Sequence, residues 1–171
     1  MIKRAHELKR SERNKLHSFI RGIYQDEDDD LFSSYLLKYP SGVVTLNTAL
    51  SFYNLIDEWV VSPFDFCFQI GYRQISDANI KQFKDKKQIQ LLGVENKFYN
   101  NISFRIYDKE RLLIELWRKE KYLSKDIYKQ AIFNYRILAN NGNLNIPLLK
   151  QYLSLIPKSN IYLKRLSLEV L

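Results

Sequence analysis

The chain has 171 residues, enough for one domain with a substantial core or for a small module followed by a larger domain. Its 46% of hydrophobic residues exclude a disordered chain, while a single Cys excludes an internal disulfide and two His leave a Cys/His zinc site short of ligands. The net charge of +8 favours an anionic partner, nucleic acid being the commonest. The N-terminal residues predict neither a signal peptide nor a membrane span, so we expect a cytoplasmic protein with no membrane partner.

The first 24 residues are expected to form a basic helix over residues 2–17 and a short wing-like strand. Good helix formers without Gly or Pro indicate the helix, and β-forming residues around Arg21-Gly22 indicate the strand. Residues 1–22 hold seven Lys or Arg and only two Glu. A solvated helix in a Lys-rich chain would account for this charge, and so would contacts with nucleic-acid phosphates. The candidate nucleic-acid-binding residues are Lys3, Arg4, Lys9, Arg10, Arg13, Lys15 and Arg21.

An acidic run follows this basic segment. Residues 25–30 contain five acids, which repel one another and indicate an exposed connection. Consecutive acids converge poorly on one ion and the pattern of a calcium loop is absent, so we expect no metal site. Asp29 or Asp30 is expected to cap a helix over residues 31–38.

A tight turn is predicted next. Pro40 fixes its own φ, and Gly42 is expected to adopt a positive φ. After two extended valines, Thr45 or Asn47 is expected to cap a helix that begins at Leu46 and runs to about residue 56.

The remaining pattern predicts an α+β fold with a small mixed or antiparallel sheet, packed helices and a helical C-terminal lobe. Period-two alternation predicts strands at residues 64–71, 88–92 and 102–107, with a basic loop near residues 80–88. Capping residues and apolar spacing predict helices at residues 108–118, 124–140, 145–156 and 159–170. The predicted core comprises Leu50, Tyr53, Leu55, Phe66, Phe68, Leu91, Phe104, Ile106, Leu113, Leu116 and Trp117.

Two segments carry recognisable motifs. The first reads Tyr-Pro-x-Gly-Val, then Thr, Ala-Leu, Leu and Asp, and comprises Tyr39, Pro40, Gly42, Val43, Thr45, Thr48, Ala49, Leu50, Leu55 and Asp57. The second is a strand-to-helix junction and comprises Asp108, Arg111, Leu112, Leu113, Glu115, Leu116 and Arg118. Together they resemble the AbiEi-type antitoxins and transcriptional regulators of type IV toxin–antitoxin (abortive infection) systems. That family often has His-Gly where this chain has Tyr53-Asn54.

The resemblance implies a function in phage defence. It implies an antitoxin domain at residues 31–171 that counteracts a nucleotidyltransferase-like toxin. No stable complex with that toxin is expected, because type IV antitoxins oppose their toxins without forming one. It also implies that residues 1–24 are the end of a truncated winged helix-turn-helix, since Leu16, Arg21, Gly22 and Tyr24 fit the closing wing strand. No catalytic residue, cofactor or metal is implied, so we expect a protein that is not an enzyme.

Two alternatives remain open. The chain could be a DNA-binding transcriptional regulator that uses residues 1–22, the basic arm, with weak sequence specificity. It could also be an endonuclease-like α+β enzyme with polar residues on or near predicted strands. The residues considered for that role are Asp65, Gln69, Gln90 and Lys97.

Overall fold

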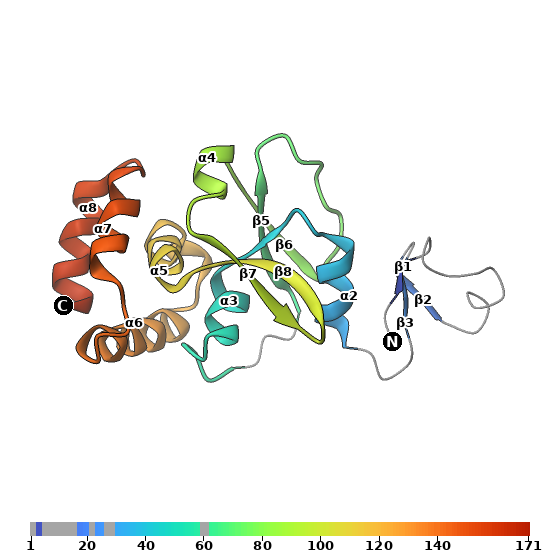
Figure 1. Ribbon diagram of the computed structural model, residues 1–171, viewed down its shortest axis with the longest axis horizontal. Helices are drawn as coiled ribbons and strands as arrows, with labels where there is room; N and C mark the ends of the chain where they lie inside the picture. Colours follow the sequence, from blue (N-terminus) through green and yellow to red (C-terminus); the bar gives the residue numbers. More distant parts are fainter. Residues whose placement is uncertain (1–2, 5–16, 21–22, 26–29, 59–61) are drawn as a thin grey trace. The chain divides into compact units, whose positions relative to one another are not determined.

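Figure 1 shows the computed structural model of the chain, which describes residues 3–4, 17–20, 23–25, 30–58 and 62–171. The chain divides into two compact units. The smaller unit comprises Met1–Gly42 and Asn96–Phe104, and the larger unit comprises Val43–Glu95 and Arg105–Leu171.

The smaller unit contains a three-stranded antiparallel sheet in the order β1-β3-β2. Its strands are β1 (Lys3–Arg4), β2 (His17–Ile20) and β3 (Ile23–Gln25). Strands β2 and β3 lie in the segment where the wing-like strand was predicted. Of the helix predicted over residues 2–17, residues 3–4 and 17 are in strands that pair with β3, and residues 5–16 lie outside the described residues. Of the seven candidate nucleic-acid-binding residues, Lys3 and Arg4 lie on β1, and Lys9, Arg10, Arg13, Lys15 and Arg21 lie outside the described residues.

The helix α2 (Leu31–Lys38) of the smaller unit begins as predicted. Asp30 is its N-cap, and its carboxylate accepts hydrogen bonds from the backbone N–H groups of Phe32 and Ser33 at 3.0 and 3.3 Å. Phe32 also packs edge-on against Tyr99, with ring centroids 5.3 Å apart.

The expected turn is present, but the prediction of a positive φ at Gly42 is wrong. The Gly42 N–H donates to the Tyr39 carbonyl at 3.0 Å, which closes a four-residue turn with Pro40 at its second position and Gly at its fourth. This arrangement belongs to the commonest turn type, in which no residue needs φ > 0. Positive φ is found instead at Gly71, Gly93 and Gly142.

A five-stranded mixed sheet has the order β6-β5-β4-β8-β7. β4 pairs antiparallel to β5 and parallel to β8, and β5 pairs parallel to β6. The strands are β4 (Val43–Val44), β5 (Phe64–Gln69), β6 (Ile80–Asp85), β7 (Val94–Tyr99) and β8 (Ile102–Tyr107). The predicted α+β class is therefore confirmed, with a mixed sheet.

Two predictions around this sheet are wrong, and one strand was not predicted. Most of the segment expected to be a basic loop is β6, which pairs with β5 along its whole length and buries Ile80, Phe83 and Asp85. The strand predicted at residues 88–92 is instead the one-turn helix α4 (Lys87–Gln90), and β7 was not predicted. A turn at Asn100-Asn101 connects β7 to β8, and both residues have positive φ, as in the tight turns that favour hairpins.

The helices of the larger unit largely follow the sequence pattern. Figure 1 shows α5 between the sheet and the group formed by α6, α7 and α8. Asp108 and Ser124 cap α5 and α6 as expected, whereas Thr45 occupies the N-cap position of α3 without a capping side-chain bond. The helices are α3 (Leu46–Phe52), α5 (Lys109–Arg118), α6 (Lys125–Asn140), α7 (Ile146–Ser154) and α8 (Ser159–Arg165), with short turns at Glu120–Tyr122 and Leu166–Val170.

The predicted core is buried with two exceptions. Leu91 is 44% exposed because it follows α4 rather than lying in a strand, and Tyr53 is half-buried at the end of α3. Within the part of the chain that is described, no helix is long and apolar enough to cross a membrane.

Candidate functional site

The most unusual feature of the larger unit is a group of polar side chains buried between the sheet and α5. On β5, Phe64, Phe66 and Phe68 are buried as the alternation predicts, but Asp65 and Cys67 in the opposite phase are buried too, at 1% and 0% exposure. β5 is an interior strand with β4 and β6 as neighbours. We name this group the polar centre. Its members are Asp65, Cys67, Asp85, Arg111, Glu115, Arg118 and Lys119.

Glu115 is the hub of the polar centre, and its side chain is fully buried. Its Oε1 lies 2.5 Å from Arg111 Nη1 and also contacts Arg118, while Oε2 lies 2.5 Å from Lys119 Nζ. Spacings of three and four residues place these groups on one face of the helix. Three cations therefore surround one carboxylate.

Asp85 connects this hub to the sheet. Its Oδ1 lies 2.7 Å from Arg118 Nη2, and its Oδ2 lies 3.3 Å from Lys119 Nζ. The Lys119 ammonium also lies 4.8 Å from the centroid of the Phe83 ring on the same strand. The end of α5 is thus held on β6 by two ion pairs and one cation–π contact.

The electrostatics of the polar centre favour fixed charges over reactive groups. Burial alone would raise the pKa of Glu115, but Arg111, Lys119 and Arg118 outweigh it and hold that pKa well below its ordinary value. Burial raises the pKa of the Cys67 thiol to about 11, so this thiol stays protonated near neutral pH and is a poor nucleophile.

Arg111 is a charged residue, yet its side chain is fully buried and contacts several groups besides Glu115. Its guanidinium lies 4.6 Å from the centroid of the Tyr107 ring and donates to the Ile89 carbonyl at 3.3 Å. Gly93, at φ +67°, allows this approach, since a Cβ there would lie 2.4 Å from Arg111 Cβ. The Gly93 carbonyl also accepts a hydrogen bond from the Asp108 N–H at 2.8 Å.

Asp65 lies beside the start of α3. Its Oδ2 accepts the Asn47 N–H at 2.9 Å, and its own N–H donates to Thr48 Oγ1 at 2.8 Å. Three buried oxygens there, Thr45 Oγ1, Asn47 Oδ1 and Asp65 Oδ1, have no hydrogen-bond partner among the described residues. Burial raises the pKa of Asp65 to about 6 against the opposing effect of Lys81. Leu46, in the middle of this cluster, has a φ of +41°, which is uncommon for a branched side chain.

The structure brings several sequence-predicted residues together in the larger unit. Thr45 borders Asp65, Ala49 and Leu50 are fully buried on α3, and Arg111 and Glu115 lie in the polar centre. Asp108 caps α5 and accepts a hydrogen bond from the Tyr152 hydroxyl at 2.8 Å. In the smaller unit, Tyr39 and Gly42 are buried and Pro40 is exposed.

The four residues considered for a nuclease differ in burial and do not all lie in the same unit. Asp65 and Gln90 are buried, Gln69 is exposed and Lys97 lies on β7 in the smaller unit. Among the residues that the structure describes, no group of three His, Cys, Asp or Glu side chains could hold a metal ion.

Sequence reasoning missed two members of the polar centre, Asp85 and Lys119. The sequence places Asp85 in an expected basic loop, and Lys119 follows a helix end, where cations are common. The signal available for Asp85 was the weak alternation that places it in phase with Phe83 and Lys81 on β6.

Comparison with known proteins adds no assignment. No family model matches the chain, and no curated protein matches it.

Proposed function

We propose that this chain is a cytoplasmic, non-enzymatic antitoxin that counteracts a nucleotidyltransferase-like toxin of a type IV toxin–antitoxin system. One observation carries the proposal: the two motifs that resemble the AbiEi-type family are neighbours in the fold. β4 of the first motif pairs in parallel with the end of β8 that leads into the second, with Val43 opposite Arg105 and Val44 opposite Ile106. The helices that follow, α3 and α5, also pack on each other.

The burial of motif residues gives them a structural role in this proposal. Arg111, Glu115, Ala49 and Leu50 are fully buried and cannot touch a toxin or its substrate directly. They fix α3 and α5 on the sheet, and the surface around them carries the antitoxic activity. This agrees with a function that needs no nucleophile.

A growth-rescue experiment tests the proposal. We expect a nucleotidyltransferase-like reading frame beside the gene of this chain, and we expect its induced expression to arrest growth. Coexpression of the chain should restore growth, and the two purified proteins should elute separately in size-exclusion chromatography. Failure to rescue by a chain that is expressed and folded would contradict the antitoxin function, whereas rescue with a stable complex would contradict only the type IV mechanism.

A second activity, DNA binding for autoregulation, is supported by the N-terminal segment. The hairpin of β2 and β3 is of the kind that forms the wing of a winged helix-turn-helix, and residues 1–22 hold seven Lys or Arg against two Glu. Gel-shift assays with the DNA upstream of the gene test this activity.

A further inference from the structure

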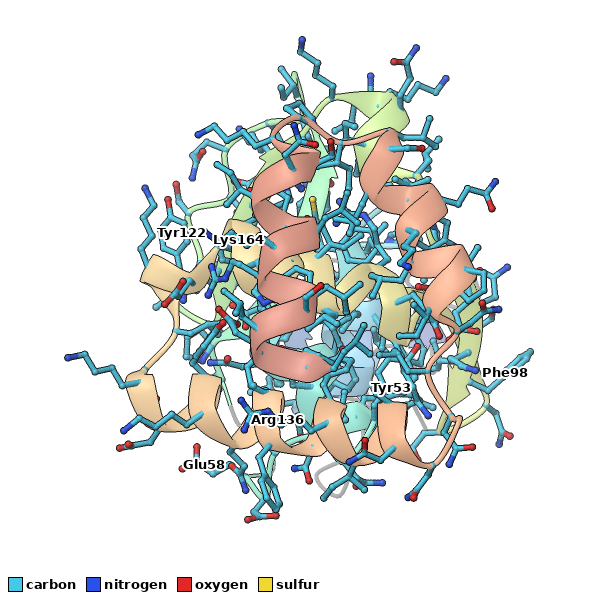
Figure 2. All side chains as sticks on the ribbon, turned by 90° about the vertical axis from the view of Figure 1, so that its left-hand side faces the viewer. Tyr53, Glu58, Phe98, Tyr122, Arg136 and Lys164 are labelled. Atoms are coloured by element: carbon cyan, nitrogen blue, oxygen red, sulfur yellow. The ribbon has the colours of Figure 1, made fainter. Side chains whose placement is uncertain are left out.

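The larger unit contains a cavity of about 770 Å³ at the C-terminal end of α5, which is lined mainly by residues 117–129. Small-molecule sites commonly enclose about 300–1,000 Å³, so the size suits a ligand of several rings or groups. Tyr122, labelled in Figure 2, lies in this segment between Lys121 and Leu123, which both line the cavity.

The apolar part of the cavity is aromatic. Trp117 and Tyr128 line it together with Leu123. The Trp117 indole N–H donates to Glu169 Oε2 at 3.0 Å, and the Tyr128 hydroxyl donates to the same oxygen at 2.5 Å. Trp117 is only 4% exposed and its ring stacks on Tyr162, so it forms part of the cavity wall and has no free ring face. Tyr128 is half-buried, with its hydroxyl bonded and Arg165 5.6 Å from its ring centroid, so at most one face of its ring is open to a ligand.

The polar part of the cavity is cationic. Arg118 and Glu120 also line it, but each is bound to a partner of opposite charge. Lys121, Lys125 and Lys129 are exposed, and within the described residues none of the three forms an ion pair with a carboxylate.

Helix stability does not explain these lysines. Lys125 and Lys129 are four residues apart on α6, so their like charges repel each other. Lys125 also lies in the first turn of α6, where the helix dipole disfavours a cation and Asp126 is the acidic residue. An anion in the cavity would relieve both effects.

We propose that this cavity binds a nucleotide, with its phosphates on Lys121, Lys125 and Lys129 and its base against Tyr128 and Leu123, above the wall that Trp117 forms. Aromatic rings bind bases through their faces, and lysines bind phosphates as point charges. This proposal does not depend on the antitoxin function, because it concerns a different surface and a different ligand.

Calorimetric titration of the full chain with ATP, GTP, CTP and UTP tests the proposal. At least one of the four should bind, and both its nucleoside and inorganic tripolyphosphate should bind at least about tenfold more weakly, since each lacks one of the two recognised parts. In a Trp59→Phe background Trp117 is the only tryptophan, and the same nucleotide should quench its fluorescence with the same affinity.

Substitutions locate the binding. The double variant Lys125→Gln/Lys129→Gln should bind at least about tenfold more weakly, because two charge-assisted hydrogen bonds are lost. The matched control Lys87→Gln/Lys150→Gln removes two other exposed lysines and should bind as the parent does. Neither variant should lose thermal stability, and the first should gain slightly because its two like charges are removed. The proposal is overturned if none of the four nucleotides binds at millimolar concentration, if tripolyphosphate binds as well as the nucleotide, or if the first variant retains full affinity.

Discussion

The ammonium of Lys119 lies 2.5 Å from Glu115 Oε2 and 3.3 Å from Asp85 Oδ2, so one side chain joins a carboxylate of α5 to a carboxylate of β6. Glu115 is fully buried, and Asp85 is nearly so. A buried carboxylate is tolerated only when its charge is matched, which makes the arrangement sensitive to removal of either partner.

Replacing Glu115 by Gln should therefore destabilise the fold strongly. The substitution leaves Arg111, Arg118 and Lys119 without their shared carboxylate, and breaking a buried pair in this way costs about 3–5 kcal/mol. Urea unfolding at pH 7 measures the loss. The control is Glu120→Gln, whose half-exposed carboxylate pairs with Arg165 and should contribute at most about 1 kcal/mol. Equal losses in the two variants would show that burial does not govern this network.

Ionisation of Asp65 should destabilise the fold as the pH rises, whereas ionisation of an ordinary ion-paired acid stabilises it. Its pKa is raised by burial to about 6, so the folded chain binds this proton more tightly than the unfolded chain does. Its contribution is thus most favourable below the unfolded pKa of about 4, and it falls as the pH rises to about 6.

Asp65→Asn should consequently stabilise the chain at pH 7.5 by about 2–3 kcal/mol and change little at pH 4, because a shift of about two pKa units corresponds to that energy. The amide still accepts the Asn47 N–H and can donate to a buried oxygen beside it. Urea unfolding at both pH values measures the difference. Asp126→Asn, in the first turn of α6, should instead cause a small loss at pH 7.5. A loss of stability at pH 7.5 in Asp65→Asn would contradict the prediction.

Gly93→Ala should be much more damaging than Gly142→Ala. Both glycines have a positive φ near 70°, so alanine is strained at either position. At Gly93 the new Cβ would also lie 2.4 Å from Arg111 Cβ, whereas nothing lies within 4 Å of it at Gly142. We expect about 1 kcal/mol at Gly142 and at least about 3 kcal/mol at Gly93, measured by denaturant unfolding. Similar losses would mean that Arg111 can move away.

Phe68→Ala should cost about 3–5 kcal/mol, because Phe68 is fully buried on β5. Leu91→Ala should change stability by less than about 1 kcal/mol, since that side chain is 44% exposed. Thermal unfolding of the two variants compares a core prediction that the structure confirms with one that it contradicts.

Elements with strong local signals can be predicted from the sequence, whereas elements that depend on contacts between distant residues cannot. Asp108 and Ser124 are helix N-caps that mark the starts of α5 and α6, and the apolar alternation of residues 102–107 marks β8. β6 could not be predicted because its lysines lower its local strand propensity, and its burial depends on pairing with β5. The polar centre was unpredictable for the same reason, since Glu115 and Asp85 meet only through the packing of α5 on the sheet.

DNA binding and antitoxic activity should be separable, because we assign the first to the basic arm (residues 1–22) and the second to residues 31–171. Four cations of the basic arm, Lys9, Arg10, Arg13 and Lys15, are replaced by Gln in one variant. The matched control replaces Lys84, Lys86, Lys87 and Lys150, which are exposed in the larger unit, so both variants lose the same charge.

The arm variant should lose DNA retention, and the slope of log affinity against log salt should fall by up to about 4, because each lost phosphate contact releases about one counterion fewer. The control should retain both the affinity and the slope. Both variants should rescue cells that express the toxin, since the two motifs lie outside the arm and the buried ion pairs around Glu115 are untouched. Filter binding at about 50–200 mM salt and growth curves provide the two measurements. Equal DNA binding by the two variants would show that the arm is not the binding surface, and failure of a folded arm variant to rescue growth would show that the two activities cannot be separated.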